Sequence, residues 1–231
     1  VLYQAYNEQD EARFIADVLN DWMNKGGSYE EAAVLYRSNA QSRAIEEALL
    51  RVSIPYRIYG GLRFYERLEI KNAIAYLKVI FNNSDNPSFE RSISNPTRGV
   101  GEKTLAKIRN AAKQYNISYI KASAKLIDEG SISGRGGSGL RDYLEFIAGC
   151  KSFIEENLLS ELMELIIKES GLYAYHAKEP GEKGKTRTEN LEELITATKN
   201  FEQSIEEEIS NIEIAEKYLD IISLDLSLIH I

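Results

Sequence analysis

One stretch of this chain combines a pair of glycines with the start of a helix: Ser94-Asn95-Pro96-Thr97-Arg98-Gly99-Val100-Gly101-Glu102-Lys103-Thr104-Leu105. Glycines at 99 and 101 allow positive φ and a close approach of the backbone to another surface. From Glu102 onward the pattern is typical of the first turn of a helix. The free N–H groups and the positive dipole end of such a turn can bind a phosphate. The stretch therefore predicts a glycine turn that leads into a phosphate-binding helix start.

The charge around this turn differs from the charge of the whole chain. The 231 residues carry a formal net charge of −8. Residues 91–121 nevertheless contain a single acid, Glu102, and these basic residues: Arg91, Arg98, Lys103, Lys107, Arg109, Lys113 and Lys121. A local basic patch of this kind favours contact with a nucleic-acid backbone. A tight interhelical turn with no ligand remains the alternative interpretation of the glycines.

The first 81 residues alternate between strand-like and helix-like patterns. Apolar runs of strand length occupy 1–6, 32–36 and 54–59, and helical spacing follows each of them, with helices expected at 41–52 and 68–81. This order predicts a parallel α/β sheet.

Ligand groups in parallel sheets lie at the carboxyl ends of the strands. Arg37, Ser38 and Asn39 follow the second expected strand, and Arg43 lies one turn into the next helix. They are therefore candidate ligand residues. The alternative is an ordinary helix cap at Ser38 or Asn39 with a solvated Arg43.

Beyond the polar cluster at 82–87 no strand pattern appears. Apolar residues three and four apart predict helices at 88–94, 102–115, 118–129, 139–156, 158–170, 188–204 and 206–222. The fold class expected is thus α/β followed by all-α. We expect a first domain over 1–81 and a helical second domain over 82–231, whose last residues we expect to be a non-native tail.

Composition narrows the function classes. The chain has one cysteine, Cys150, and two histidines, so a disulfide framework and a structural zinc site are not expected. No apolar run approaches the ~20 residues that span a bilayer, so we expect no membrane partner and a cytoplasmic location. Because the chain starts at Val1 and not at a methionine, we expect a fragment.

Three motifs do not fit their usual contexts. The run 134–139 matches G-x-G-x-x-G but follows a helical pattern and not a strand. Gly184-Lys185-Thr186 resembles the end of a P-loop, yet Glu179 occupies the position of the leading glycine, and 179–187 is expected to be an exposed charged linker. The acidic residues of 202–216 are most simply a solvated helix face. No catalytic or metal-ligating residues are expected.

Four blocks in order resemble one family. They are Ala33-Val34-Leu35-Tyr36-Arg37-Ser38-Asn39-Ala40-Gln41-Ser42-Arg43, the segment from Ile54 to Lys71, Asn95-Pro96-Thr97-Arg98-Gly99-Val100-Gly101, and the segment from Gly181 to Leu194. Together they closely resemble the UvrD/Rep/PcrA family of superfamily 1 DNA helicases, over residues 1 to about 222.

The resemblance implies a domain assignment and a function. Residues 1–81 would be part of the second RecA-like domain (2A), and 82–231 its helical insertion (2B). The parent would be an ATP-dependent 3′→5′ DNA helicase of repair or replication. The expected partners are a duplex with a 3′ single-stranded tail and repair proteins.

The resemblance also implies roles for individual residues. Contacts to duplex phosphates are implied for Thr97, Arg98, Gly99, Val100, Gly101, Lys103 and Thr104. Contacts to the single strand or to the moving domain interface are implied for Arg37, Ser38, Asn39, Arg43 and, in the loop 60–67, Arg63.

The family's nucleotide motifs have no counterpart in these residues. ATP and Mg²⁺ are therefore expected in the parent and not in this piece, since phosphoryl transfer needs the lysine, the metal and the arginines together. A helical protein–protein interaction module that regulates a helicase or nuclease complex is the alternative function.

Overall fold

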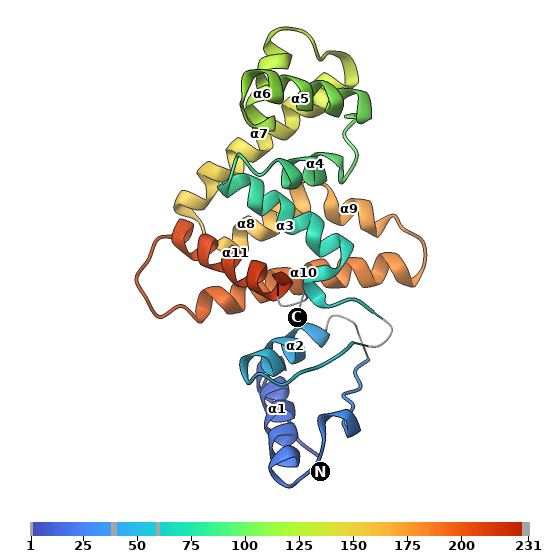
Figure 1. Cartoon of the computed structure of the whole chain (residues 1–231), viewed down its shortest axis with the longest axis vertical. Coiled ribbons are helices and arrows are strands. Elements are labelled where there is room, and N and C mark those ends of the chain that lie inside the picture. The colour runs from blue at the N-terminus through green and yellow to red at the C-terminus, as the bar shows by residue number, and fades with distance from the viewer. Residues whose placement is uncertain (1, 38–40, 59–60, 228–231) are drawn as a thin grey trace. The chain divides into compact units, whose positions relative to one another are not determined.

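The computed structural model describes residues 2–37, 41–58 and 61–227. The chain divides into two compact units, Val1–Arg67 and Leu68–Ile231 (Figure 1). Each unit packs around its own buried side chains.

The first unit is built on two helices, α1 (Glu8–Asn24) and α2 (Ser42–Arg51), with the short 3₁₀ turns η1 (Tyr29–Glu31) and η3 (Phe64–Glu66). The side-chain oxygen of Asn7 accepts a hydrogen bond from the N–H of Asp10 (2.8 Å) and so caps the start of α1. Ala16, Leu49 and Ile54 form a small core between α1, α2 and the segment that follows α2. The helix expected at 41–52 is thus confirmed.

The expected parallel sheet is wrong. Residues 2–37, 41–58 and 61–227 contain helices and turns and no strand. The apolar runs predicted burial, but a strand also needs a hydrogen-bonded neighbour. No backbone hydrogen bond joins the described parts of the three segments to one another. Leu35, in the second of these runs, is 93% exposed. The fold class of the described residues is therefore all-α.

The second unit is a bundle of nine described helices. They are α3 (Leu68–Phe81), α4 (Asn86–Ser94), α5 (Glu102–Tyr115), α6 (Tyr119–Asp128), α7 (Gly134–Glu156), α8 (Leu159–Glu169), α9 (Leu172–Ala177), α10 (Glu182–Gln203) and α11 (Asn211–Ser227). The expected helix at 102–115 is confirmed by α5, and the one at 68–81 by α3. Two helices begin earlier than expected, α7 at Gly134 and α10 at Glu182, so most of the expected linker 179–187 is helical.

Helix α3 forms the centre of this unit. It is apolar on nearly all sides, and Ile70, Ala73, Tyr76 and Leu77 are fully buried. Such a helix needs neighbours all round, and α4, α7, α8 and α10 pack against it. By packing, α3 belongs with the helices that follow it. The domain boundary expected after residue 81 concerns the family's domains and stays a prediction.

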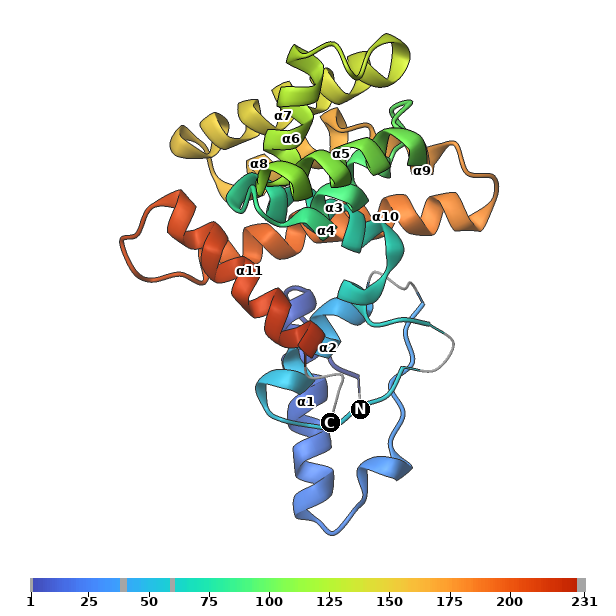
Figure 2. The same cartoon turned by 45° about the horizontal axis from the view of Figure 1, so that its top comes forward.

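Helices α5 and α6 pack against each other, and α6 also packs against α7 (Figure 2). The connection from α4 to α5 contains the glycine turn at 99–101, next to the start of α7. Of the helices that the structure describes, none has the length and apolarity needed to cross a bilayer.

Candidate nucleic-acid interface

The turn between α4 and α5 has the backbone shape of an open helix start. Gly99 has φ +74°, a conformation that favours glycine. Gly101 is the N-cap of α5 with an extended backbone (φ −98°, ψ 179°), so only the first glycine uses positive φ. Both glycines are exposed, and the Val100 side chain between them is buried. The valine thus fixes the turn to the protein while the flanking backbone faces solvent.

The first amides of α5 are available to a ligand. No side chain caps this helix, because its N-cap is Gly101. The N–H groups of Thr104 and Leu105 donate to the Gly101 carbonyl at 2.9 and 3.0 Å. Within the described residues, the N–H groups of Glu102 and Lys103 have no hydrogen-bond acceptor. Exposed, unpaired amides at a helix N-terminus are the groups that bind phosphate.

The basic residues near the turn differ in what they contact. Several bond within the protein: Arg91 to Asn72, Lys107 to the Ser131 carbonyl, Arg109 to Glu90 and Glu102, and Arg98 to three carbonyls. Lys103 is exposed on the first turn of α5 and has no hydrogen-bond or ion-pair partner in the part of the chain that the structure describes. Lys103 therefore places a free positive charge beside the unpaired amides.

Arg98 points into the second unit. Its Nη1 donates to the carbonyls of Pro96 (2.9 Å) and Ser92 (3.2 Å), and its Nη2 donates to the carbonyl of Ser170 (2.7 Å). Its Cζ lies 5.5 Å from the ring centre of Tyr76 and 5.6 Å from that of Tyr143. Burial raises the pKa of Tyr76 to about 12, so this phenol stays neutral at physiological pH. The phosphate contact expected of Arg98 stays a prediction.

The glycine-rich run 134–139 is the start of α7, and it packs against the turn. A Cβ on Gly139 would lie 2.0 Å from the Arg98 carbonyl oxygen, and one on Gly136 would lie 3.1 Å from the Gly99 carbonyl oxygen. These glycines therefore let two backbones approach closely, and they do not follow a strand.

The same contact brings Arg135 beside Gly99. The Arg135 Cγ lies 3.0 Å from where a Gly99 Cβ would be, and the side chain is exposed. We did not single out this cation from the sequence, where its only signal is its place in a glycine-rich helix start.

The remaining candidate residues belong to the first unit. Arg37 is exposed, while Ser38 and Asn39 lie outside the described residues. Arg43 is 1% exposed and forms ion pairs with Glu8 (2.9 Å) and Glu47 (2.7 Å). The Arg63 guanidinium lies over the Tyr56 ring, 5.1 Å from its centre. The single-strand or interface roles expected of these residues stay predictions.

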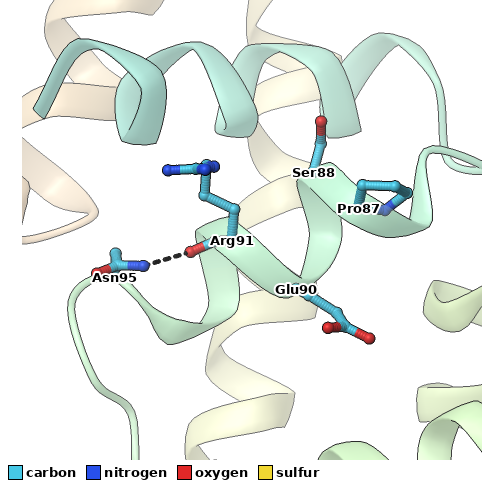
Figure 3. Close-up of a pocket in the computed structure, with 5 residues that line it drawn as sticks. All are labelled: Pro87, Ser88, Glu90, Arg91 and Asn95. Carbon is cyan, nitrogen blue, oxygen red and sulfur yellow. Dashed lines mark hydrogen bonds between the residues drawn. The ribbon is translucent and has the colours of Figure 1, made fainter. Parts of the chain in front are cut away.

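An open cleft of about 410 Å³ lies on α4 near the turn (Figure 3). Its lining residues are Pro87, Ser88, Glu90, Arg91 and Asn95. The side chains with charge are already engaged, Glu90 by Arg109 and Arg91 by Asn72. The cleft thus adds no free charge to the turn.

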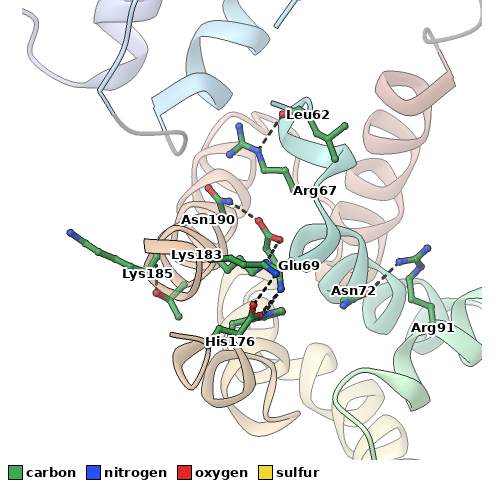
Figure 4. A network of polar contacts seen from close by, with 12 residues as sticks. Leu62, Arg67, Glu69, Asn72, Arg91, His176, Lys183, Lys185 and Asn190 are labelled. Atoms are coloured by element: carbon green, nitrogen blue, oxygen red, sulfur yellow. Dashed lines mark hydrogen bonds and ion pairs between the residues drawn. The ribbon is translucent and has the colours of Figure 1, made fainter. Parts of the chain in front are cut away.

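A polar network ties α10 to α3 and α9 (Figure 4). Asn190 Nδ2 donates to Glu69 (2.6 Å), and Arg187 lies between Glu69 (3.6 Å) and Glu179 (2.5 Å). Glu179 also accepts a hydrogen bond from Nδ1 of the fully buried His176 (2.6 Å). The network explains why the charged segment expected to be a linker is instead folded against the bundle.

Stability in acid is expected to depend on Glu179. The hydrogen bond from His176, and then Arg187, lower the pKa of Glu179 from 4.5 to about 2. A lowered carboxyl pKa contributes stability above pH 4.5, and that contribution is lost as the pH falls from 4.5 towards 2. Urea unfolding of the 231-residue chain and of Glu179→Gln, from pH 7 to pH 3, is expected to show a stability difference that shrinks below pH 4.5. A difference that stays constant over this range would contradict the assignment.

The segment that resembles the end of a P-loop is helical. Gly184, Lys185 and Thr186 lie inside α10 and not in a loop after a strand. A Cβ on Gly184 would lie 2.3 Å from the Glu179 carbonyl oxygen, so this glycine serves helix packing. Among the described residues, no three His, Cys, Asp or Glu side chains are grouped so that they could hold a metal ion.

Comparison with known proteins gives consistent matches. Residues 1–133 match the family model of the UvrD-like helicase C-terminal domain. Over 207 residues the chain is 46% identical to "DNA helicase II" of Escherichia coli (strain K12). The aligned region covers 90% of this chain and 29% of that protein. It is 48% identical over 200 residues to "DNA helicase II" of Haemophilus influenzae, covering 87% of this chain and 28% of that protein. It is 37% identical over 207 residues to "ATP-dependent DNA helicase PcrA" of Leuconostoc citreum, covering 89% of this chain and 28% of that protein. The chain therefore spans less than a third of the length of these relatives.

Proposed function

The chain belongs to the UvrD-like helicase C-terminal domain family, and we propose that it is the part of an ATP-dependent 3′→5′ DNA helicase that holds duplex DNA next to a 3′ single-stranded tail. The names of its relatives, DNA helicase II and ATP-dependent DNA helicase PcrA, support this proposal. The parent would act in DNA repair or replication, in the cytoplasm, with repair proteins as further partners.

One observation supports the DNA contact above all others. Two amides at the start of α5 are exposed and unpaired, and Lys103 adds a positive charge at the same point. Together they offer a phosphate two N–H donors and one ammonium group, which is the chemistry of backbone contacts to DNA. These groups contact no base, so binding should not depend on the DNA sequence. The hydroxyls of Thr97 and Thr104 are placed on the same segment and complete the proposed contact surface.

The overall negative charge of the chain does not oppose this contact. Salt screens charges that lie more than about 8 Å apart at physiological ionic strength, so the field at the phosphate is set by its neighbours. Near the turn Glu102 is bound to Arg109 (2.5 Å), which offsets the one acid of the segment. Lys103 and Arg135 then make the electrostatic potential at the turn positive.

ATP and Mg²⁺ belong to this proposal only through the parent protein. In this proposal the present piece contributes DNA binding, and the nucleotide is bound by other parts of the parent. We accordingly expect no ATPase activity from the 231-residue chain by itself.

Removing the Lys103 charge is expected to weaken DNA binding about fivefold, equivalent to about 1 kcal/mol. Because one phosphate contact is lost, the slope of log K against log[salt] should fall by about 0.9. The measurement is fluorescence anisotropy of the 231-residue chain with a tailed duplex between 50 and 200 mM salt, for the wild type and Lys103→Ala.

Lys113→Ala is the matched control. Lys113 is exposed on the same helix, ten residues further on and so about 15 Å along the axis. Its loss should leave the salt slope unchanged. Equal effects of the two substitutions, or an affinity of the wild type that does not depend on salt, would contradict the proposal. Capture of a protein partner in high salt, with no DNA binding in low salt, would favour the interaction-module alternative.

A further inference from the structure

We infer that Arg98 is a positioning residue, which holds the glycine turn in its DNA-binding shape from inside the protein and does not itself pair with a phosphate. The inference rests on the proposed function, since it concerns how the same turn contacts DNA. It goes beyond that proposal because it assigns Arg98 a structural role in which this side chain does not contact DNA.

The hydrogen bonds of Arg98 are directed at the ends of two helices. Ser92 lies in the last turn of α4, and Ser170 is the residue that ends α8. Carbonyls at helix C-termini lack partners within the helix and carry the negative end of the dipole. The Arg98 guanidinium donates to both of them and to the Pro96 carbonyl. One planar group thus joins α4, α8 and the turn.

Aromatic side chains complete the anchor. The rings of Tyr76 and Tyr143 lie within cation–π distance of the guanidinium. Their hydroxyls bond to the same segment, Tyr76 to the Asn95 carbonyl (2.8 Å) and Tyr143 to the Ser92 hydroxyl (2.6 Å). These contacts use three of the five N–H donors of the guanidinium and bring two rings against it. Arg98 is therefore held in place without DNA.

The anchor lies next to the amides that it serves. Gly99 follows Arg98 directly, and the unpaired amides begin three residues later, at Glu102. The Arg98 carbonyl is also the atom that abuts Gly139 of α7. Fixing Arg98 at its side chain and at its backbone leaves the following residues little freedom, so the amides are held in position before DNA arrives.

Arg98→Lys separates positioning from direct contact. A lysine keeps the positive charge that a phosphate contact needs, but it cannot donate in one plane to three carbonyls. With a positioning role, Arg98→Lys and Arg98→Ala should both weaken binding to the tailed duplex by about tenfold, or about 1.4 kcal/mol. Wild-type affinity for Arg98→Lys, together with weak binding and a smaller salt slope for Arg98→Ala, would overturn the inference.

Hydrogen exchange without DNA gives a second, independent measurement. In the 231-residue chain, the hydrogen-bonded amides of Asn95, Thr104 and Leu105 should be less protected from exchange in Arg98→Lys than in the wild type, and protected as in the wild type in Lys103→Ala. Because DNA is absent, this result does not depend on the proposed function. Weak or salt-independent DNA binding by all variants would contradict the proposed function alone, whereas unchanged exchange in Arg98→Lys would overturn the positioning role.

Tyr76→Phe tests the anchor without touching any charge. It removes only the hydroxyl that bonds to the Asn95 carbonyl. Lower protection of the Asn95, Thr104 and Leu105 amides and DNA binding weakened about threefold, with an unchanged salt slope, are expected. Wild-type exchange and affinity in this variant would count against the inference even if both Arg98 variants failed to fold.

Discussion

Gly139→Ala is expected to lower the free energy of unfolding of the 231-residue chain by about 2 kcal/mol and to weaken its binding to a tailed duplex. The added Cβ would lie 2.0 Å from the Arg98 carbonyl oxygen and 3.1 Å from the Arg98 Cβ. The first of these atoms is backbone, so relief requires that α7 or the glycine turn moves. Urea unfolding and fluorescence anisotropy measure the two effects.

Gly149→Ala on the same helix is the matched control. A Cβ at this exposed position would meet no atom within 4 Å. Alanine has the higher helix propensity, so this variant should gain up to about 1 kcal/mol of stability and bind DNA as the wild type does. The two substitutions are thus expected to have opposite signs. A stabilised Gly139→Ala would show that the contact between α7 and the turn is not as close as described.

The start of α7 illustrates where sequence patterns fall short. From the sequence we expected this helix at residue 139, because glycines have low helix propensity. In the structure α7 begins at Gly134, since glycines at 136 and 139 are the residues that allow it to touch the 98–99 backbone. Tertiary contact thus outweighs local propensity here. The partner of these glycines lies about 40 residues earlier in the chain, and no local pattern identifies it.

The strand predicted at 32–36 is wrong for a related reason. Continuous apolar residues of strand length predict burial, but they contain no information about which segment would pair with them. Leu35 is 93% exposed, and no backbone hydrogen bond links this run to the other two extended segments among the described residues. Helix α3 was predicted correctly because the pattern that indicates it lies within the helix's own sequence. Its apolar residues recur three and four apart from Leu68 to Phe81.

In the candidate site, too, local features can be predicted from the sequence and tertiary contacts cannot. The positive φ of Gly99 and the helix start at Glu102 follow from residue type and order, and the structure agrees with them, whereas Gly101 is extended. The contacts of Arg98 could not be foreseen, since its acceptors are backbone carbonyls, which have no sequence signature. The sequence therefore predicts a phosphate contact for Arg98 from charge alone and gives no sign of these carbonyl contacts.

Glu69→Ala is expected to lower the free energy of unfolding by about 3 kcal/mol. Glu69 is 4% exposed and accepts a hydrogen bond from Asn190 (2.6 Å), which is 2% exposed. Its other oxygen lies 3.6 Å from Arg187 Nε. Alanine would remove the acceptor of the Asn190–Glu69 hydrogen bond and part of the counter-charge of the half-buried Arg187 guanidinium. Urea unfolding at pH 7 measures the loss.

Glu164→Ala separates the effect of burial from the loss of a carboxylate as such. Glu164 pairs with Lys168 on the surface of α8, where both side chains are about half exposed. Surface pairs of this kind contribute about 0.5 kcal/mol or less, so this variant should unfold almost as the wild type does. Similar losses in Glu69→Ala and Glu164→Ala would contradict a special role for the buried network.

Glu69→Gln distinguishes the two contacts of the buried carboxylate. Its amide oxygen can still accept the hydrogen bond from Asn190, while the negative charge that faces Arg187 is gone. Arg187 keeps its ion pair with Glu179 at 2.5 Å, so it is not left alone. The loss should therefore be about 1 kcal/mol, clearly smaller than for alanine. If glutamine costs as much as alanine, the charge and not the hydrogen bond to Asn190 holds α10 against α3.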